Sequence, residues 1–211
     1  MKISSTVIFN TTAVLVIILL LILIILPFNI NNLEQAQRIT VWKTKYENLK
    51  YCFSLVNLYE NSIIQTESEA GRLFSEEDMI NRIKPYFNFI ENPEYKSKRY
   101  HYRKMNGRPA TKNGQFYFNK FFKCKDGALL SIRKNNNEII SENQPQFFMY
   151  VDINGKKKPN RIGQDIFFIS IFKDHIEALG HDRPYSALKT NCSPIGSGVY
   201  CSEYYILGGR F

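Results

Sequence analysis

The stretch Gln146–Phe172, QFFMYVDINGKKKPNRIGQDIFFISIF, joins two runs of aromatic and β-branched residues through a polar loop. Each run has the length and composition of a β-strand. The loop contains Asn154-Gly155 and Pro159, residue types that favour turns. The stretch therefore predicts two neighbouring strands, Gln146–Ile153 and Asp165–Phe172, connected by a turn.

Two further strand-like runs precede this stretch, Gly114–Phe122 (GQFYFNKFF) and Ala128–Lys134 (ALLSIRK). The tripeptides Lys125-Asp126-Gly127 and Asn135-Asn136-Asn137 supply turns after them. Because connections this short join strands that run antiparallel, the four runs predict an antiparallel meander.

Upstream of the strands, apolar residues recur at helical steps of three and four: Ile39, Trp42, Tyr46, Leu49, Phe53 and Val56. This stripe predicts an amphipathic helix that covers the apolar face of the sheet. A second helix is expected from Ser75, where Asp78 completes a capping-box pattern, to Pro85. The fold class is therefore α+β, a long N-terminal helix packed on an antiparallel β-sheet.

The N-terminal residues Ala13–Phe28 are apolar and uncharged, and with the apolar residues before them they approach the roughly 20 needed to cross a bilayer. The run is too long for a cleavable signal, so we expect a retained single-pass anchor. Lys2, the only basic residue before Arg38, favours a cytoplasmic N-terminus and an exported domain, periplasmic or extracellular. The expected parts are an anchor (1–28), a helical extension (29–60) and an exported α+β domain (61–211).

Four cysteines in an exported domain suggest disulfides. Cys192 and Cys201 flank a short loop rich in Gly, Pro and Ser, which makes them the first predicted pair. A Cys52–Cys124 pair follows only by elimination. No CxxC pair or neighbouring histidine supports a zinc site.

The net charge of +9 would attract nucleic acid or another anionic polymer, although a basic soluble surface is the simpler explanation. One cluster, Lys96–Lys104 (KSKRYHYRK), mixes cations with aromatics in a way that suits single-stranded nucleic acid or an exposed linker. No catalytic motif occurs, and His175 and His181 lack a third ligand. We therefore expect a protein that is not an enzyme.

The loop within the opening stretch offers oxygen donors from Asp152, Asn154, Asn160 and Asp165, which makes it a candidate calcium loop. Its spacing does not fit an EF-hand, and Lys156–Lys158 would repel a divalent ion. The alternative is a turn in which these side chains cap backbone amides.

Taken together, the apolar helix with a proline, the amphipathic stripe, the antiparallel sheet and the C-terminal cysteine loop resemble a type IV pilin or a type II secretion pseudopilin. Ile39–Val56 resembles the exposed half of the long pilin helix, and Met79–Phe89 resembles the helix that follows it in one subgroup. Val151–Phe167 is similar to that subgroup's DxNGxxxPNxxGxDxF segment. Related pseudopilins hold calcium in a nearby loop.

The resemblance implies a leader cleaved by a prepilin peptidase and a methylated mature chain. Alignment on Pro27 places the cut between Ser5 and Thr6, where Ser5 replaces the usual glycine and Asn10 the usual glutamate. That glutamate normally neutralises a neighbouring subunit's amine in the apolar filament core, and Asn10 cannot. A minor or tip subunit would tolerate the change.

The expected function is that of a structural subunit, minor or at the tip, of a type IV pilus or type II secretion pseudopilus. Its expected partners are other pilin-like subunits and the inner-membrane assembly machinery. The alternative is a membrane-anchored exported domain that captures DNA or an anionic polymer and forms no filament.

Overall fold

The computed structural model describes residues 5–64, 74–96, 101–110, 118, 120–135, 144–155 and 157–210. Side chains of residues 5–11, 24–31, 91–96 and 120 are outside the description. The chain divides into two compact units, Met1–Gln37 and Arg38–Phe211, which are treated separately.

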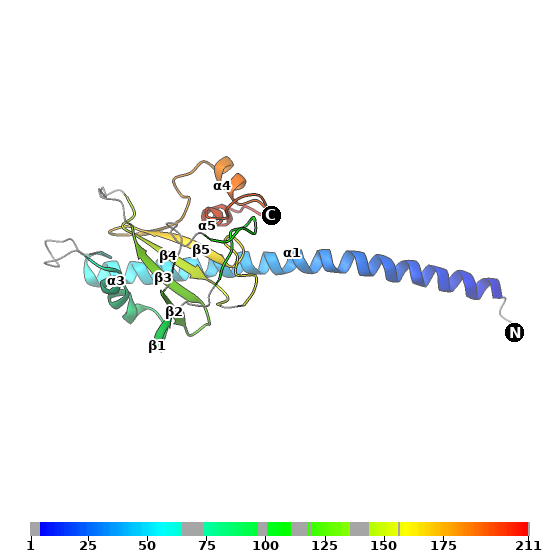
Figure 1. Cartoon of the computed structure of the whole chain (residues 1–211), viewed down its shortest axis with the longest axis horizontal. Coiled ribbons are helices and arrows are strands. Elements are labelled where there is room, and N and C mark those ends of the chain that lie inside the picture. Colours follow the sequence, from blue (N-terminus) through cyan, green and yellow to red (C-terminus); the bar gives the residue numbers. More distant parts are fainter. Residues whose placement is uncertain are drawn as a thin grey trace. The chain divides into compact units, whose positions relative to one another are not determined.

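The protein is an α+β protein whose six strands form one antiparallel sheet in the order β1-β2-β3-β4-β5-β6 (Figure 1). The helices are α1 (Ser5–Glu60), α3 (Glu76–Ile83), the 3-10 turn η1 (Lys84–Tyr86), α4 (Tyr185–Asn191) and α5 (Cys201–Ile206). The strands are β1 (Phe89–Lys96), β2 (Lys120–Cys124), β3 (Leu129–Lys134), β4 (Phe147–Asp152), β5 (Ile166–Ile171) and β6 (Ile176–Ala178). The predicted antiparallel meander is confirmed.

Two strands escaped prediction, and both lie at the edges of the sheet. β1 contains Pro93 and a register shift, features that are tolerated at an edge and that hide a strand pattern. β6 has only three residues, too few to show a periodicity. The predicted run Gly114–Phe122 falls largely outside the described residues, but its end belongs to β2, which continues to Cys124.

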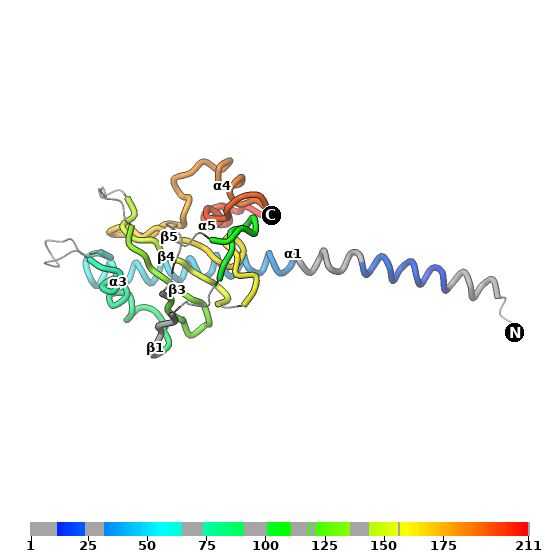
Figure 2. Tube along the Cα trace, in the orientation of Figure 1, coloured from blue at the N-terminus to red at the C-terminus, as the bar shows by residue number. Residues whose placement is uncertain are grey.

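The central strands β4 and β5 are buried along their whole length because the sheet is covered on both faces. Met149 and Ile169 point into a large cluster shared with α1, whereas Tyr150 and Phe168 point into a second cluster on the other face. The tube in Figure 2 shows β3, β4 and β5 side by side in the middle of this unit. Double burial explains why these strands read as continuous apolar runs and not as an alternation.

The C-terminal part of α1 covers the first of these faces, as its apolar stripe predicts. Trp42, Tyr46, Leu49, Phe53 and Val56 are all buried. Trp42 stacks on Phe167 of β5 with 4.4 Å between ring centroids, and its Nε1 donates to the carbonyl of Ser202, 3.0 Å away. The Ala178 amide donates to the Tyr46 hydroxyl at 3.1 Å. Burial and hydrogen bonds to α5 and β6 thus fix this part of α1 in place.

The short helix α3 begins with the predicted capping box. The Ser75 hydroxyl accepts from the Asp78 amide, and the Asp78 carboxylate accepts from the Ser75 amide. The helix ends at Ile83, two residues before Pro85, in agreement with the expected stop.

In the N-terminal unit, α1 carries a run of aliphatic residues from Val14 to Leu23. Each side chain of the run is 45% to 65% exposed. In the described part of the chain, no helix combines the length and the apolarity needed to span a membrane.

Candidate functional site

The loop between β4 and β5 gathers the four residues predicted as a calcium loop. Asp165 lies at the centre: its carboxylate accepts the amides of Asn160 at 2.7 Å and Arg161 at 2.6 Å. The Asn154 side chain also donates to Asp165, at 3.4 Å, and the Asn154 amide donates to Asp152 at 3.1 Å. The structure therefore brings Asp152, Asn154, Asn160 and Asp165 together.

The electrostatics of this loop favour the turn. Burial raises the pKa of Asp165, although the hydrogen bonds from Arg161, Asn160 and Asn154 oppose that rise. The carboxylate is already engaged by the loop itself, as a capping group would be. Asn154 Oδ1 is a buried oxygen with no hydrogen-bond partner among the described residues. This oxygen is therefore available as a ligand for a cation in the loop.

No group of three or more His, Cys, Asp or Glu residues in the described ranges is arranged to hold a metal ion. The turn accounts for Asp165 directly, and a calcium titration is the test of the alternative.

The same loop packs tightly against the C-terminal helices. Gly163 has a φ of +82°, and a Cβ there would lie 2.5 Å from the sulfur of Cys201. The Tyr205 hydroxyl donates to the Gly163 carbonyl at 3.0 Å. Only glycine fits this contact, which explains its place in the loop.

The predicted Cys192–Cys201 disulfide is present, with 4.9 Å between the two Cα atoms, and it joins the end of α4 to the start of α5. Cys52 and Cys124 are free thiols in the part of the chain that the structure describes, so the pairing reached by elimination is not formed. Cys52 lies on α1, where its sulfur contacts the Tyr86 carbonyl at 3.3 Å, and Cys124 ends β2. Elimination cannot reveal that the two thiols stand on different walls of a cavity.

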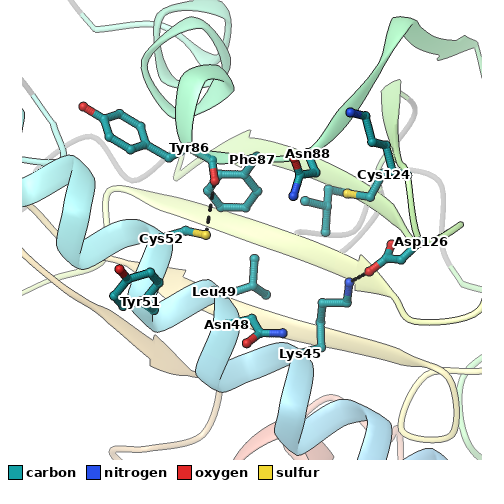
Figure 3. Close-up of a pocket in the computed structure, with 12 residues that line it drawn as sticks. Lys45, Asn48, Leu49, Tyr51, Cys52, Tyr86, Phe87, Asn88, Cys124 and Asp126 are labelled. Carbon is teal, nitrogen blue, oxygen red and sulfur yellow. Dashed lines mark hydrogen bonds and ion pairs between the residues drawn. The ribbon is translucent and has the colours of Figure 1, made fainter.

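That cavity, about 340 Å³ in volume, is a second candidate site (Figure 3). Lys45, Asn48, Asn88 and the thiols of Cys52 and Cys124 all line it, together with aromatic rings. Its volume lies in the range of small-molecule sites, and its apolar walls with a few polar groups have the composition of one.

The charged residues Lys45, Lys125 and Asp126 line this cavity. The Lys45 ammonium forms an ion pair with Asp126, in the turn after β2. Burial opposes ionisation of Asp126, but the hydrogen bonds from Lys45 and from the Ala128 amide, together with the Lys45 charge, outweigh it and lower the pKa of that carboxyl. No sequence signal could link Lys45 with Asp126, because 81 positions separate them.

A third group surrounds the histidines near β6. Glu177 Oε1 lies 3.5 Å from the Nε2 atoms of both His175 and His181. His181 Nδ1 lies 3.6 Å from Glu203, whose pKa is raised by burial despite the opposing effect of His181. The Glu177 carboxylate in β6 thus lies close to both histidines, a proximity that their spacing in the sequence does not indicate.

The residues predicted for processing and assembly lie in α1. Ser5, Thr6, Asn10 and Pro27 all have helical backbone, but their side chains are outside the description, and the predicted leader residues Met1–Ser4 are not among the described residues. Residues 97–100 of the basic cluster Lys96–Lys104 also lie outside them. Comparison of the chain with protein-family models, curated proteins and solved structures finds no match.

Proposed function

We propose that this protein is a structural subunit, minor or at the tip, of a filament of the type IV pilus or type II secretion pseudopilus kind. The observation that carries the proposal is the run from Val14 to Leu23 in α1, where every side chain is aliphatic and exposed. A helix that is apolar on all sides needs an apolar environment, either lipid or other helices. A filament subunit uses both in turn: it is stored in the membrane and then packs with neighbouring copies.

The second unit supports the proposal from the other end of α1. There the helix becomes one-sided and buries its stripe on the sheet, so one helix carries both an apolar segment and a folded domain. The Cys192–Cys201 disulfide is typical of an oxidising compartment, which supports export of that domain. The partners in this proposal are other pilin-like subunits, the inner-membrane assembly machinery and a prepilin peptidase.

The experiment is to shear surface filaments from the producing cells and assay them for this chain. We expect the wild-type chain in the filament fraction and expect Leu19→Lys to be absent from it. A charge at the centre of an apolar helix costs about 2.5–3.5 kcal/mol in a bilayer. Leu58→Lys is the matched control, because Leu58 is 70% exposed on the part of α1 that carries the domain.

Both variants must keep the Cys192–Cys201 disulfide, which shows that the exported domain is folded. Absence of the wild-type chain from the filaments, or normal incorporation of Leu19→Lys, would overturn the proposal.

A second candidate function, capture of DNA or an anionic polymer, is favoured by one observation. Lys125, Lys157 and Lys158 are exposed on two loops that touch, because a Cβ at Gly155 would lie 2.5 Å from the Gly127 carbonyl oxygen. A gel shift whose affinity falls steeply with salt, and which weakens in Lys157→Gln/Lys158→Gln, would support it. Absent or salt-insensitive binding would remove this function.

A further inference from the structure

The thiols of Cys52 and Cys124 are not explained by filament assembly. Both line the cavity between α1, η1 and the turn after β2, and in Figure 3 both sulfur atoms lie on the cavity side of their elements. Cys52 is half-buried and Cys124 is 8% exposed. Cys52 is therefore the more accessible of the two thiols.

Lys45 gives the cavity a cation. Its side chain is 15% exposed and pairs with Asp126, but an ammonium carries three N–H donors and so can contact a second anion. Burial raises the pKa of both Cys52 and Cys124, and the Lys45 charge opposes part of that rise. The site thus combines an accessible thiol, a second thiol and a cation suited to a carboxylate.

We propose that this cavity is a thiol–disulfide exchange site for small disulfides that carry carboxylates, with Cys52 as the attacking thiol and Cys124 as the resolving thiol. Lys45 is the positioning residue that holds the carboxylate of the incoming disulfide. The proposal does not depend on filament assembly.

The exchange balances in two steps. Cys52 loses its proton to solvent and attacks one sulfur of the incoming disulfide, so the S–S bond breaks, a small thiolate leaves and a mixed disulfide forms. Cys124 then loses its proton and attacks the Cys52 sulfur, which releases the second small thiolate. The two cysteines are oxidised by two electrons, and the incoming disulfide is reduced to two thiols.

The product is a Cys52–Cys124 cystine, which ties α1 to the end of β2. Cys52 and Cys124 line the same cavity, so the bond forms within it. The bond would link residues from distant parts of the chain and close a long loop, which stabilises the folded state.

The pH dependence has a definite direction. Burial raises the pKa of the Cys52 thiol, and burial also raises the pKa of Cys124 to about 12, so both are mostly protonated at neutral pH. Because the thiolate is the attacking species, exchange is slow near pH 7 and accelerates as the pH rises.

The test uses the full chain in mild detergent, with oxidised glutathione as the carboxylate-bearing probe. Before treatment, denaturation and alkylation should label two thiols, while Cys192 and Cys201 stay bonded. After treatment we expect no labelled thiol, a peptide cross-linked between Cys52 and Cys124, and a higher melting temperature. Persistence of both labelled thiols, or bonds only between chains, would overturn the proposal.

Variants assign the roles of the three residues. Cys124→Ser should stop at a glutathione adduct on Cys52, and Cys52→Ser should leave Cys124 unreacted. Cystamine, a small disulfide with ammonium groups, is the matched probe. Glutathione disulfide should react about two- to fivefold faster relative to cystamine, the range expected for one ion pair, and Lys45→Gln should abolish this preference. An adduct on Cys124 in the wild-type chain, or an unchanged preference in Lys45→Gln, would contradict these roles.

Discussion

The packing of α1 on the sheet can be tested at Trp42. Its side chain is 0% exposed, its ring lies 4.4 Å from that of Phe167, and its Nε1 donates to the Ser202 carbonyl. Removal of a buried Trp side chain costs about 3–5 kcal/mol, so Trp42→Ala should lower the free energy of unfolding by that amount. Trp42→Phe keeps a ring but leaves the Ser202 carbonyl without this donor, at a cost of about 1–3 kcal/mol.

The assay is urea denaturation of the full chain in mild detergent. The chain has one tryptophan, so unfolding must be followed by far-UV circular dichroism and not by tryptophan fluorescence. Leu58→Ala is the control, since Leu58 is 70% exposed on the same helix and its truncation should stay within about 0.5 kcal/mol. If Trp42→Ala unfolds at the same urea concentration as Leu58→Ala, α1 does not pack on the sheet through this residue.

Three further predictions concern charge and the loop. Glu203→Gln should gain stability relative to wild type between pH 4 and pH 7. Burial raises the pKa of Glu203 in the folded state, so the wild type loses stability as the pH rises through that pKa, whereas glutamine does not titrate. If the difference in unfolding free energy between Glu203→Gln and wild type is the same at pH 4 and at pH 7, this prediction is wrong. Millimolar calcium should leave the melting temperature unchanged, because Asp165 already accepts three hydrogen bonds. A rise in melting temperature with calcium that is lost in Asp165→Asn would instead show a calcium site. Gly163→Ala should destabilise more than Gly107→Ala: both glycines have positive φ, but only at Gly163 would a Cβ strike the Cys201 sulfur. Equal urea midpoints for the two variants would refute the clash.

The central part of the fold follows from local patterns. The stripe through Trp42 and Phe53 predicts α1 packing because helical spacing is a local signal, and the Ser75–Asp78 box marks a helix start in the same way. The runs of β4 and β5 read as strands because burial on both faces demands apolar residues throughout. An edge strand does not need apolar residues throughout, so the sequence of β1 does not predict a strand.

The candidate sites were harder to predict because they depend on contacts between distant segments. The loop residues around Asp165 were identified, since they are close in sequence and share one residue chemistry. The cavity was not, because Lys45 and Asp126 meet only after the sheet folds against α1. Likewise, the sequence pairs Cys52 with Cys124 only by elimination, and elimination does not indicate that the two thiols line one cavity.

The proposal of a filament subunit is tested most directly by the mass of the N-terminus of the chain purified from cells with an active prepilin peptidase. The proposal predicts a chain that begins at methylated Thr6, after loss of the residues up to Ser5. A chain that retains Met1 in those cells would contradict it.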